Sequence, residues 1–190
     1  MSSPVRIELP VSRETLALLA VGDEVRLWGP VYTARDAGHE RLLAALAQAG
    51  ELPHELAGHT LFYAGPTPAV DNYPAGSVGP TTARRMDAAT PALLRAGVVA
   101  AIGKGARTPV ARAAFAETGS VYFAAVGGAA ALLGAHVIAA KPVAWPDLGT
   151  EALVRMTLAD FPAFVAIDTT GADLYELGPA EWLAESGGAL

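Results

Sequence analysis

The sequence predicts a mixed α/β domain built in three layers. Apolar strand-like segments alternate with helical segments through the middle of the chain, and further strand-like segments lie at both ends. Alternation of this kind is typical of a sheet covered by helices, and the extra strands at the ends favour a sheet of mixed direction. With 190 residues and no internal repeat, the chain is expected to form a single domain over residues 1–190.

In the first half of the chain, apolar runs predict four strands and helical spacing predicts two helices. The expected strands cover residues 5–9, 25–28, 31–33 and 60–63, and the expected helices cover residues 12–19 and 35–49. Ser12 is suited to cap the first helix, and Gly50 ends the second. Glycine and proline recur through residues 65–82, which predicts a long loop, and such loops in compact domains are usually functional or disordered.

The second half continues the alternation and ends in a predicted hairpin. Thr90 and Thr108, each followed by proline, are expected to cap two helices that end near Gly97 and Glu117. The remaining elements are expected as strands at 98–102, 121–126 and 137–144, a helix that opens after Gly127-Gly128, a helical turn or two at 151–154, and a hairpin formed by residues 164–167 and 174–176.

Charge and composition argue against several classes of function. The chain has a net charge of −6 and lacks the clustered positive charge that is typical of a nucleic-acid-binding protein. No run of about 18 apolar residues predicts a membrane span, and the first residues do not resemble a secretory signal, so we expect a cytoplasmic protein. The chain has no cysteine, which excludes disulfides and thiolate metal sites formed by this chain alone.

A first cluster of polar residues follows the long loop. The segment Gly79-Pro-Thr-Thr-Ala-Arg-Arg-Met-Asp87 gathers hydroxyls, cations and a carboxylate beside a glycine. The guanidinium of Arg85 can bind a carboxylate through two parallel hydrogen bonds, so we predict that Arg85 is a binding residue. Arg84 is instead expected to lie on the surface and pair with Asp87 one turn later. Thr81 and Thr82 can bind a ligand oxygen or cap the next segment, and a threonine hydroxyl is a weak base without a carboxylate to accept its proton.

Lys104 lies between Gly103 and Gly105 at the end of a predicted buried strand. Ligands in α/β sheets collect at the carboxyl ends of strands, which favours a role for Lys104 in holding an anion. A nucleotide-binding P-loop is rejected, because Val98 stands where the motif requires its first glycine and Gly105 follows the lysine. The remaining alternative is a turn lysine whose neighbouring glycines serve only the backbone.

A second cluster lies where the strand that ends near Thr33 turns into a helix. Arg35 occupies a corner suited to anion binding. Asp36 and His39 are three residues apart and can share one side of the helix, but two ligands are too few for a catalytic metal. We therefore expect Asp36 to cap the helix and His39 to form a local hydrogen bond.

Taken in order, these segments resemble the β subunit, or C-terminal domain, of class I iron–sulfur fumarases and L(+)-tartrate dehydratases. The resemblance extends from about residue 5 to residue 176. The segments that carry it are 32–39 (Tyr-Thr-Ala-Arg-Asp-Ala-Gly-His), 63–68, 79–87, 102–105 (Ile-Gly-Lys-Gly), 121–133 and 160–162. Two positions depart from the family pattern: Arg84 replaces a glycine, and Ala89 stands where an aromatic residue is common.

The resemblance implies a swivelling β/β/α domain that closes over a 4Fe-4S cluster, whose open iron acts as a Lewis acid on the substrate. In that family the cluster is held by cysteines of the α subunit or N-terminal domain, so this chain is expected to need a cysteine-containing α subunit as partner. The resemblance also suggests an assembly of two α and two β subunits. By motif position, Arg35, Arg85 and Lys104 correspond to residues that bind the substrate carboxylates. Thr81 corresponds to a catalytic threonine that takes part in proton abstraction with an aspartate of the partner.

The function expected from this resemblance is that of the β subunit of a hydro-lyase acting on a four-carbon dicarboxylate, active only with its α subunit. Interconversion of fumarate and malate is the first expectation, and dehydration of L(+)-tartrate is the second. The alternative from another class is a non-catalytic swivelling module that only binds dicarboxylates. None of these readings calls for nucleic acid or a membrane as a partner.

Overall fold

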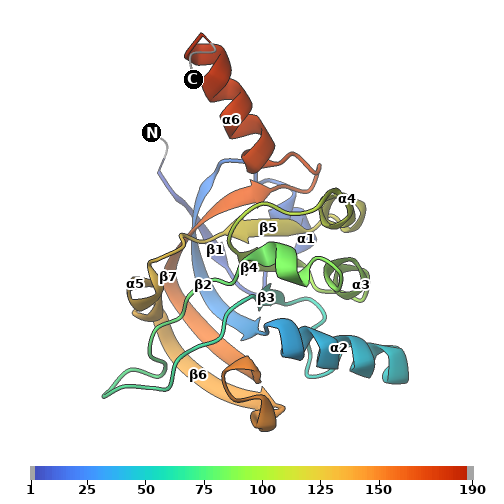
Figure 1. The fold of residues 1–190 in the computed structure, drawn as a ribbon, viewed down its shortest axis with the longest axis vertical. Coiled ribbons are helices and arrows are strands. Elements are labelled where there is room, and N and C mark those ends of the chain that lie inside the picture. Colours follow the sequence, from blue (N-terminus) through green and yellow to red (C-terminus); the bar gives the residue numbers. More distant parts are fainter. Residues whose placement is uncertain (1–2, 188–190) are drawn as a thin grey trace.

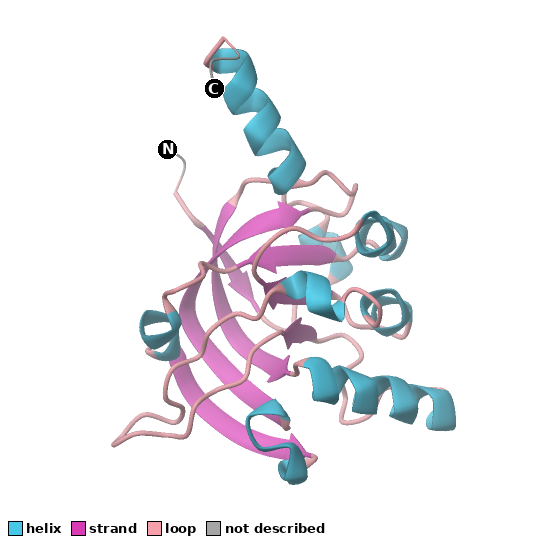
Figure 2. Ribbon diagram, in the orientation of Figure 1, coloured by secondary structure: helices cyan, strands magenta, loops and turns pink. Residues whose placement is uncertain are grey.

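The computed structural model of the chain describes residues 3–187. The strands are β1 (Val5–Glu8), β2 (Glu24–Thr33), β3 (Thr60–Phe62), β4 (Ala100–Gly103), β5 (Val121–Ala124), β6 (Val137–Ala144) and β7 (Leu153–Ile167). The α-helices are α1 (Arg13–Leu16), α2 (Asp36–Ala49), α3 (Thr90–Arg95), α4 (Pro109–Thr118), α5 (Ala130–Gly134) and α6 (Leu174–Glu185), and two 3₁₀ helices are η1 (Ala83–Met86) and η2 (Pro146–Glu151). The mixed α/β class predicted from the sequence is confirmed (Figure 2).

The seven strands form one sheet in the order β1-β2-β3-β4-β5-β7-β6. Strands β1 to β5 pair in parallel, whereas β7 runs antiparallel to β2, β5 and β6. Because β7 pairs with both β2 and β5, strands β2, β3, β4, β5 and β7 form a closed ring (Figure 1). Closure gives every strand of the ring a partner on both sides, and β1 and β6 are the outer strands of the sheet.

The core has two parts, one inside the ring and one beneath the helices. Alternate side chains of a strand point to opposite faces, so Phe62 and Phe123 lie inside, while Leu61 and Tyr122 face the helices. Phe62 packs edge-on against Phe161 of β7, with ring centroids 5.4 Å apart, although β3 and β7 are not paired. Helices α2, α3 and α4 cover the outer face in Figure 1 and contribute Leu42, Leu93, Leu94, Ala114 and Phe115.

Two predictions for the end of the chain are wrong. Residues 164–167 belong to the long strand β7 and residues 174–176 begin helix α6, so no hairpin connects them. The side chain of Asp173 accepts a hydrogen bond from the backbone N–H of Tyr175, which starts the helix despite Gly178 and Pro179 further along. The helical turns expected at 151–154 end at Glu151, and β7 begins at Leu153.

Other differences are smaller. The two strands expected at 25–28 and 31–33 are one strand, β2, which passes Gly29 through a shift in its pairing with β7. Ser12 and Thr108 cap α1 and α4 as predicted. Thr90 does not cap α3, because it is the first residue of that helix and its hydroxyl accepts a hydrogen bond from Arg107. No helix within residues 3–187 combines the length and apolar character needed to cross a membrane.

Candidate anion-binding site

Thr81 and Lys104 lie side by side at the carboxyl end of β4. The backbone N–H of Lys104 donates to the carbonyl of Thr81 at 3.1 Å, and the N–H of Thr81 donates to the carbonyl of Tyr63 at 2.6 Å. The chain at residues 80–83 therefore lies between the extensions of β3 and β4: Pro80 is bridged to Ala64 in antiparallel fashion, and Thr82 is bridged to Lys104 in parallel fashion. This short extension ends the long loop and brings together two residues predicted for the site.

Arg85 lies one turn further along, in η1, and faces the start of α2. Its Nε donates to Oδ1 of Asp36 at 3.0 Å, and its Nη2 donates to Oδ2 at 2.6 Å. Such a two-bond fork fixes the plane of the guanidinium. Asp36 was expected to cap α2, but it is the first residue of that helix, and its carboxylate binds Arg85 instead.

Arg35 precedes Asp36 and occupies the cap position of α2 without a capping hydrogen bond from its side chain. Its guanidinium lies 3.6 Å from the carboxylate of Glu151, and its stem packs against Gly65. A Cβ at Gly65 would approach Cδ of Arg35 to 2.8 Å, so this glycine leaves the room that Arg35 needs. The buried Nε of Arg35 has no hydrogen-bond partner within the described residues.

The predicted residues are thus brought together in two neighbouring groups. Thr81 and Lys104 form one group at the end of β4, and Arg35 and Arg85 form the other at the amino-terminal end of α2. Helix η1, which follows Thr81 and contains Arg85, connects the groups. The positive end of the α2 dipole lies at the second group, beside the carboxylates of Asp36 and Glu151.

Lys104 borders a hollow of about 390 Å³. The hollow is mostly apolar and is also lined by residues 124–127, Phe164, Leu174 and Tyr175. The stem of Lys104 packs close to Gly127, and the backbone N–H of Gly105 donates to the hydroxyl of Tyr175 at 3.0 Å. Helix α6 therefore contributes a wall beside the predicted binding lysine, which the sequence did not indicate.

A buried ion pair between Asp87 and Arg107 lies next to the site residues in the sequence, and the sequence analysis did not predict it. Nε of Arg107 donates to Oδ1 of Asp87 at 2.6 Å, and its Nη2 donates to the hydroxyl of Thr90 at 2.7 Å. The other carboxylate oxygen of Asp87 accepts the backbone N–H of Thr108 at 2.6 Å. Arg84, predicted to pair with Asp87, is exposed and forms no ion pair within residues 3–187.

Arg107 stays charged in this environment. Burial acts to lower the pKa of its guanidinium, but the neighbouring Tyr63 and the Asp87 carboxylate outweigh burial and hold that pKa above its ordinary value. The guanidinium also lies 4.8 Å from the ring centre of Tyr122. In the sequence, only Asp87 in the segment 79–87 hints at the Asp87–Arg107 pair, because Arg107 is not part of a recognisable motif.

His39 forms the local hydrogen bond that the sequence predicts. Its Nδ1 lies 2.8 Å from the carbonyl oxygen of Arg35, and since a carbonyl only accepts, Nδ1 carries the proton. The ring is buried and packs edge-on against Tyr63, with centroids 5.1 Å apart. Burial lowers the pKa of His39 to about 4, so the imidazole is neutral near pH 7 and positions the backbone of Arg35 without adding charge.

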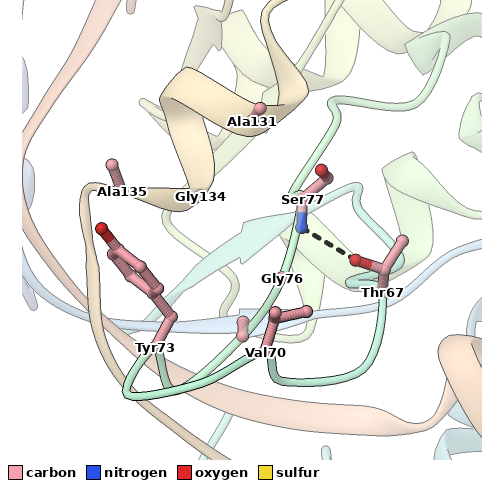
Figure 3. Close-up of a pocket in the computed structure, with 9 residues that line it drawn as sticks. Thr67, Val70, Tyr73, Gly76, Ser77, Ala131, Gly134 and Ala135 are labelled. Atoms are coloured by element: carbon pink, nitrogen blue, oxygen red, sulfur yellow. Dashed lines mark hydrogen bonds between the residues drawn. The ribbon is translucent and has the colours of Figure 1, made fainter.

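A second hollow, of about 280 Å³, lies apart from these residues between the long loop and α5 (Figure 3). Its wall includes Thr67, whose hydroxyl accepts the backbone N–H of Ser77 at 2.8 Å. Tyr73, Gly134 and other small or apolar residues complete the lining. None of Arg35, Thr81, Arg85 and Lys104 lines it, so this hollow is separate from the candidate site.

The fold defines a mixed α/β domain in which Arg35, Arg85 and Lys104 lie at the ends of strands and helices. Residues 1–178 match the family described as Fumarase C-terminus, and the chain belongs to this family. The resemblance found in the sequence is thereby confirmed.

Two groups of relatives differ in length. The chain is 36% identical over 169 residues to "Fumarate hydratase class I, anaerobic" of Escherichia coli, a match that covers 86% of this chain and 31% of that protein. It is 34% identical over 172 residues to "Putative L(+)-tartrate dehydratase subunit beta" of Methanocaldococcus jannaschii, covering 87% of this chain and 88% of that protein. The chain therefore spans about a third of the length of the class I fumarate hydratases it matches.

Proposed function

We propose that this chain is the β subunit of a hydro-lyase that adds water to, or removes it from, a four-carbon dicarboxylate. The observation that supports this proposal is that four residues from three separate family segments form two neighbouring groups at strand and helix ends: Arg35, Thr81, Arg85 and Lys104. Three cations suit a substrate with two carboxylates. The conversion of fumarate to malate is the first candidate reaction, since fumarate hydratases are prominent among the relatives.

Each residue has a role in this proposal. Arg35, Arg85 and Lys104 bind and orient the two carboxylates, and they stabilise the charge that builds up when the carbon beside a carboxylate loses its proton. Preorganised donors of this type typically contribute about 3 kcal/mol each to lowering the barrier. Thr81 contributes its hydroxyl to proton abstraction, and because a threonine is a weak base, it requires a carboxylate from a partner.

The 4Fe-4S cluster of the proposed enzyme does not fit this chain. The sequence has no cysteine, and no three His, Asp or Glu side chains in residues 3–187 are grouped to hold a metal ion. The cluster therefore belongs to the partner in this proposal. The chemistry assigned to this chain is limited to holding carboxylates and supplying part of a proton acceptor.

The partner is a cysteine-containing α subunit, with two copies of each chain as the proposed assembly. Support comes from the printed name of a relative, "subunit beta", of which the match covers 88%. A swivelling three-layer domain that closes over the partner's cluster, and a cytoplasmic location, belong to the same proposal.

L(+)-tartrate dehydratase is the second candidate, because the Methanocaldococcus jannaschii relative of matching length has that name. Purification of the chain from its native host, followed by assays with fumarate, L-malate and L(+)-tartrate, tests both reactions. A coloured complex with a cysteine-containing partner that hydrates fumarate supports the first candidate, and preference for tartrate supports the second. A colourless single chain that binds malate without turnover would indicate a dicarboxylate-binding module instead.

A further inference from the structure

Two of the three cations proposed to bind substrate are already held by carboxylates of this chain. Asp36 binds Arg85, and Glu151 faces Arg35. Lys104 forms no ion pair in the part of the chain that the structure describes. The two carboxylates need an explanation, since they reduce the positive charge of the region that is proposed to attract a dianion.

The geometry of the Arg85–Asp36 pair leaves room for a second carboxylate. A guanidinium has five N–H donors, and Asp36 occupies only the side formed by Nε and Nη2. The opposite side, formed by Nη1 and the second hydrogen of Nη2, keeps two parallel donors. Arg85 can therefore hold Asp36 on one side and a ligand carboxylate on the other.

The pair contributes little to stability but strongly restricts orientation. The Arg85 side chain is 51% exposed and that of Asp36 is 36% exposed, and ion pairs with such exposure are typically weak. Without Asp36, the long arginine side chain would sample several rotamers and lose entropy when a ligand fixed it. A carboxylate that fixes the arginine beforehand removes that cost from ligand binding.

Asp36 is itself well placed to act as a fixed support. It is the first residue of α2, and Glu151 accepts the backbone N–H of the next residue, Ala37, at 2.8 Å. The same Glu151 faces Arg35, whose carbonyl is held by His39. The amino-terminal turn of α2 is thus bonded to η2 through Glu151 and to η1 through Arg85, which restricts the positions that Asp36 can adopt.

We infer that Asp36 is a positioning residue for diacid binding, which orients Arg85 so that its free side receives a substrate carboxylate. This inference rests on the proposed function, since it requires Arg85 to bind the diacid. In the opposite role, Asp36 would be a competitor that the substrate must displace from Arg85. The two roles predict opposite changes in affinity when the charge of Asp36 is removed.

The test is a double-mutant cycle on the protein in its native assembly, with succinate as a non-reacting dicarboxylate probe and calorimetry as the measurement. Asp36→Asn should weaken succinate binding by roughly tenfold, since an amide cannot accept both bonds of the fork. Arg85→Ala should weaken binding at least as much, and the double variant no more than Arg85→Ala alone. Asp36→Glu, which keeps a carboxylate, should recover part of the affinity.

Glu117→Gln is the matched control. Glu117 binds Arg95 through the same fork, with distances of 2.9 and 2.6 Å, on the exposed surfaces of α3 and α4. This variant should leave the dissociation constant of succinate unchanged. Unchanged or tighter binding in Asp36→Asn, or additive losses in the double variant, would overturn the positioning role while the proposed function stands. A wild-type assembly that binds neither succinate nor L-malate would instead overturn the proposed function, and this inference with it.

Discussion

The side chains of Lys104 and Arg85 are positioned by different kinds of contact with the rest of the chain. Arg85 is oriented by Asp36, whereas Lys104 is positioned by its backbone bonds to Thr81 and by packing of its stem on Gly127. Lys104 therefore carries the unneutralised positive charge of the set. Its removal should therefore weaken the interaction with a substrate carboxylate directly.

We predict that Lys104→Ala lowers kcat/KM for fumarate in the native assembly by about 10- to 100-fold, the usual loss for a hydrogen bond to a charged group. Arg85→Ala should cause a loss of similar size. Steady-state kinetics measure both, and Lys141→Ala on the exposed side of β6 is the control for simple loss of a positive charge. Near-normal kcat/KM in both variants would remove these residues from the site.

His39 makes stability depend on pH. Burial lowers its pKa from 6.5 to about 4, so the unfolded chain binds a proton more readily than the folded chain between these values. Stability therefore rises with pH through this window and falls as the pH drops from 6.5 towards 4. Between pH 7 and pH 5 the contribution of His39 should fall by about 2 kcal/mol.

Urea unfolding at pH 7 and pH 5 measures this change. His39→Gln keeps a side-chain donor for the Arg35 carbonyl and has no group that titrates in the window, so the variant should lose less stability between the two pH values. The variant can be less stable at pH 7 without affecting the argument. An unchanged slope in the variant would show that other groups cause the pH dependence.

Among the elements, those with local signals in the sequence were predicted well. Strands such as β5 are continuous apolar runs, and α4 has Thr108-Pro109 at its start and Gly119 at its end. The error at α6 has a local cause, because Gly178-Pro179 weakens the helical pattern while Asp173 provides the start through its own side chain. A cap of this kind is hard to distinguish from a turn residue without knowing where the preceding strand ends.

The buried pair Asp87–Arg107 joins elements that carry different parts of the site. Asp87 follows η1, and Arg107 lies in the segment that leads from Lys104 to α4. We predict that Asp87→Asn destabilises the chain by about 3–5 kcal/mol, because Arg107 would remain charged and buried without its counter-ion. The free energy of unfolding in urea gives the comparison.

The exposed pair Arg95–Glu117 provides the control, since it also links two elements, α3 and α4. Glu117→Gln should cost less than about 1 kcal/mol. Both variants neutralise the carboxylate that binds an arginine, so the difference between their losses of stability reports the effect of burial. Equal losses would mean that Arg107 finds water or another acceptor when Asp87 is neutralised.

At the scale of the whole molecule, the contacts that the sequence did not predict join distant parts of the chain. Arg85 and Asp36 are 49 residues apart, and Arg107 and Asp87 are 20 residues apart. Closure of the ring depends on β7 pairing with β2, which lies more than a hundred residues earlier. Neither periodicity nor turn chemistry reports which distant strands meet, so the sequence predicted the mixed sheet but not its closed form.

The closed ring leads to a prediction about the chain on its own. Its interior is filled by large apolar side chains, and the outer face is covered by helices of the same chain. We therefore expect residues 1–190 to fold without a partner and to unfold in one cooperative transition, seen identically by circular dichroism and tryptophan fluorescence. The same isolated chain should not hydrate fumarate, because the proposed cluster and the carboxylate that assists Thr81 belong to the α subunit.

Mixing the folded chain with the cluster-bearing partner should then restore turnover without changing the secondary structure of the chain. A chain that folds alone but turns over fumarate only with the partner would show that the partner is required for chemistry and not for the fold. A chain that remains unfolded until the partner is added would show that the ring and its helices need the interface for stability. Turnover by the isolated chain would contradict the division of the active site between two subunits, since both halves would then reside in this sequence.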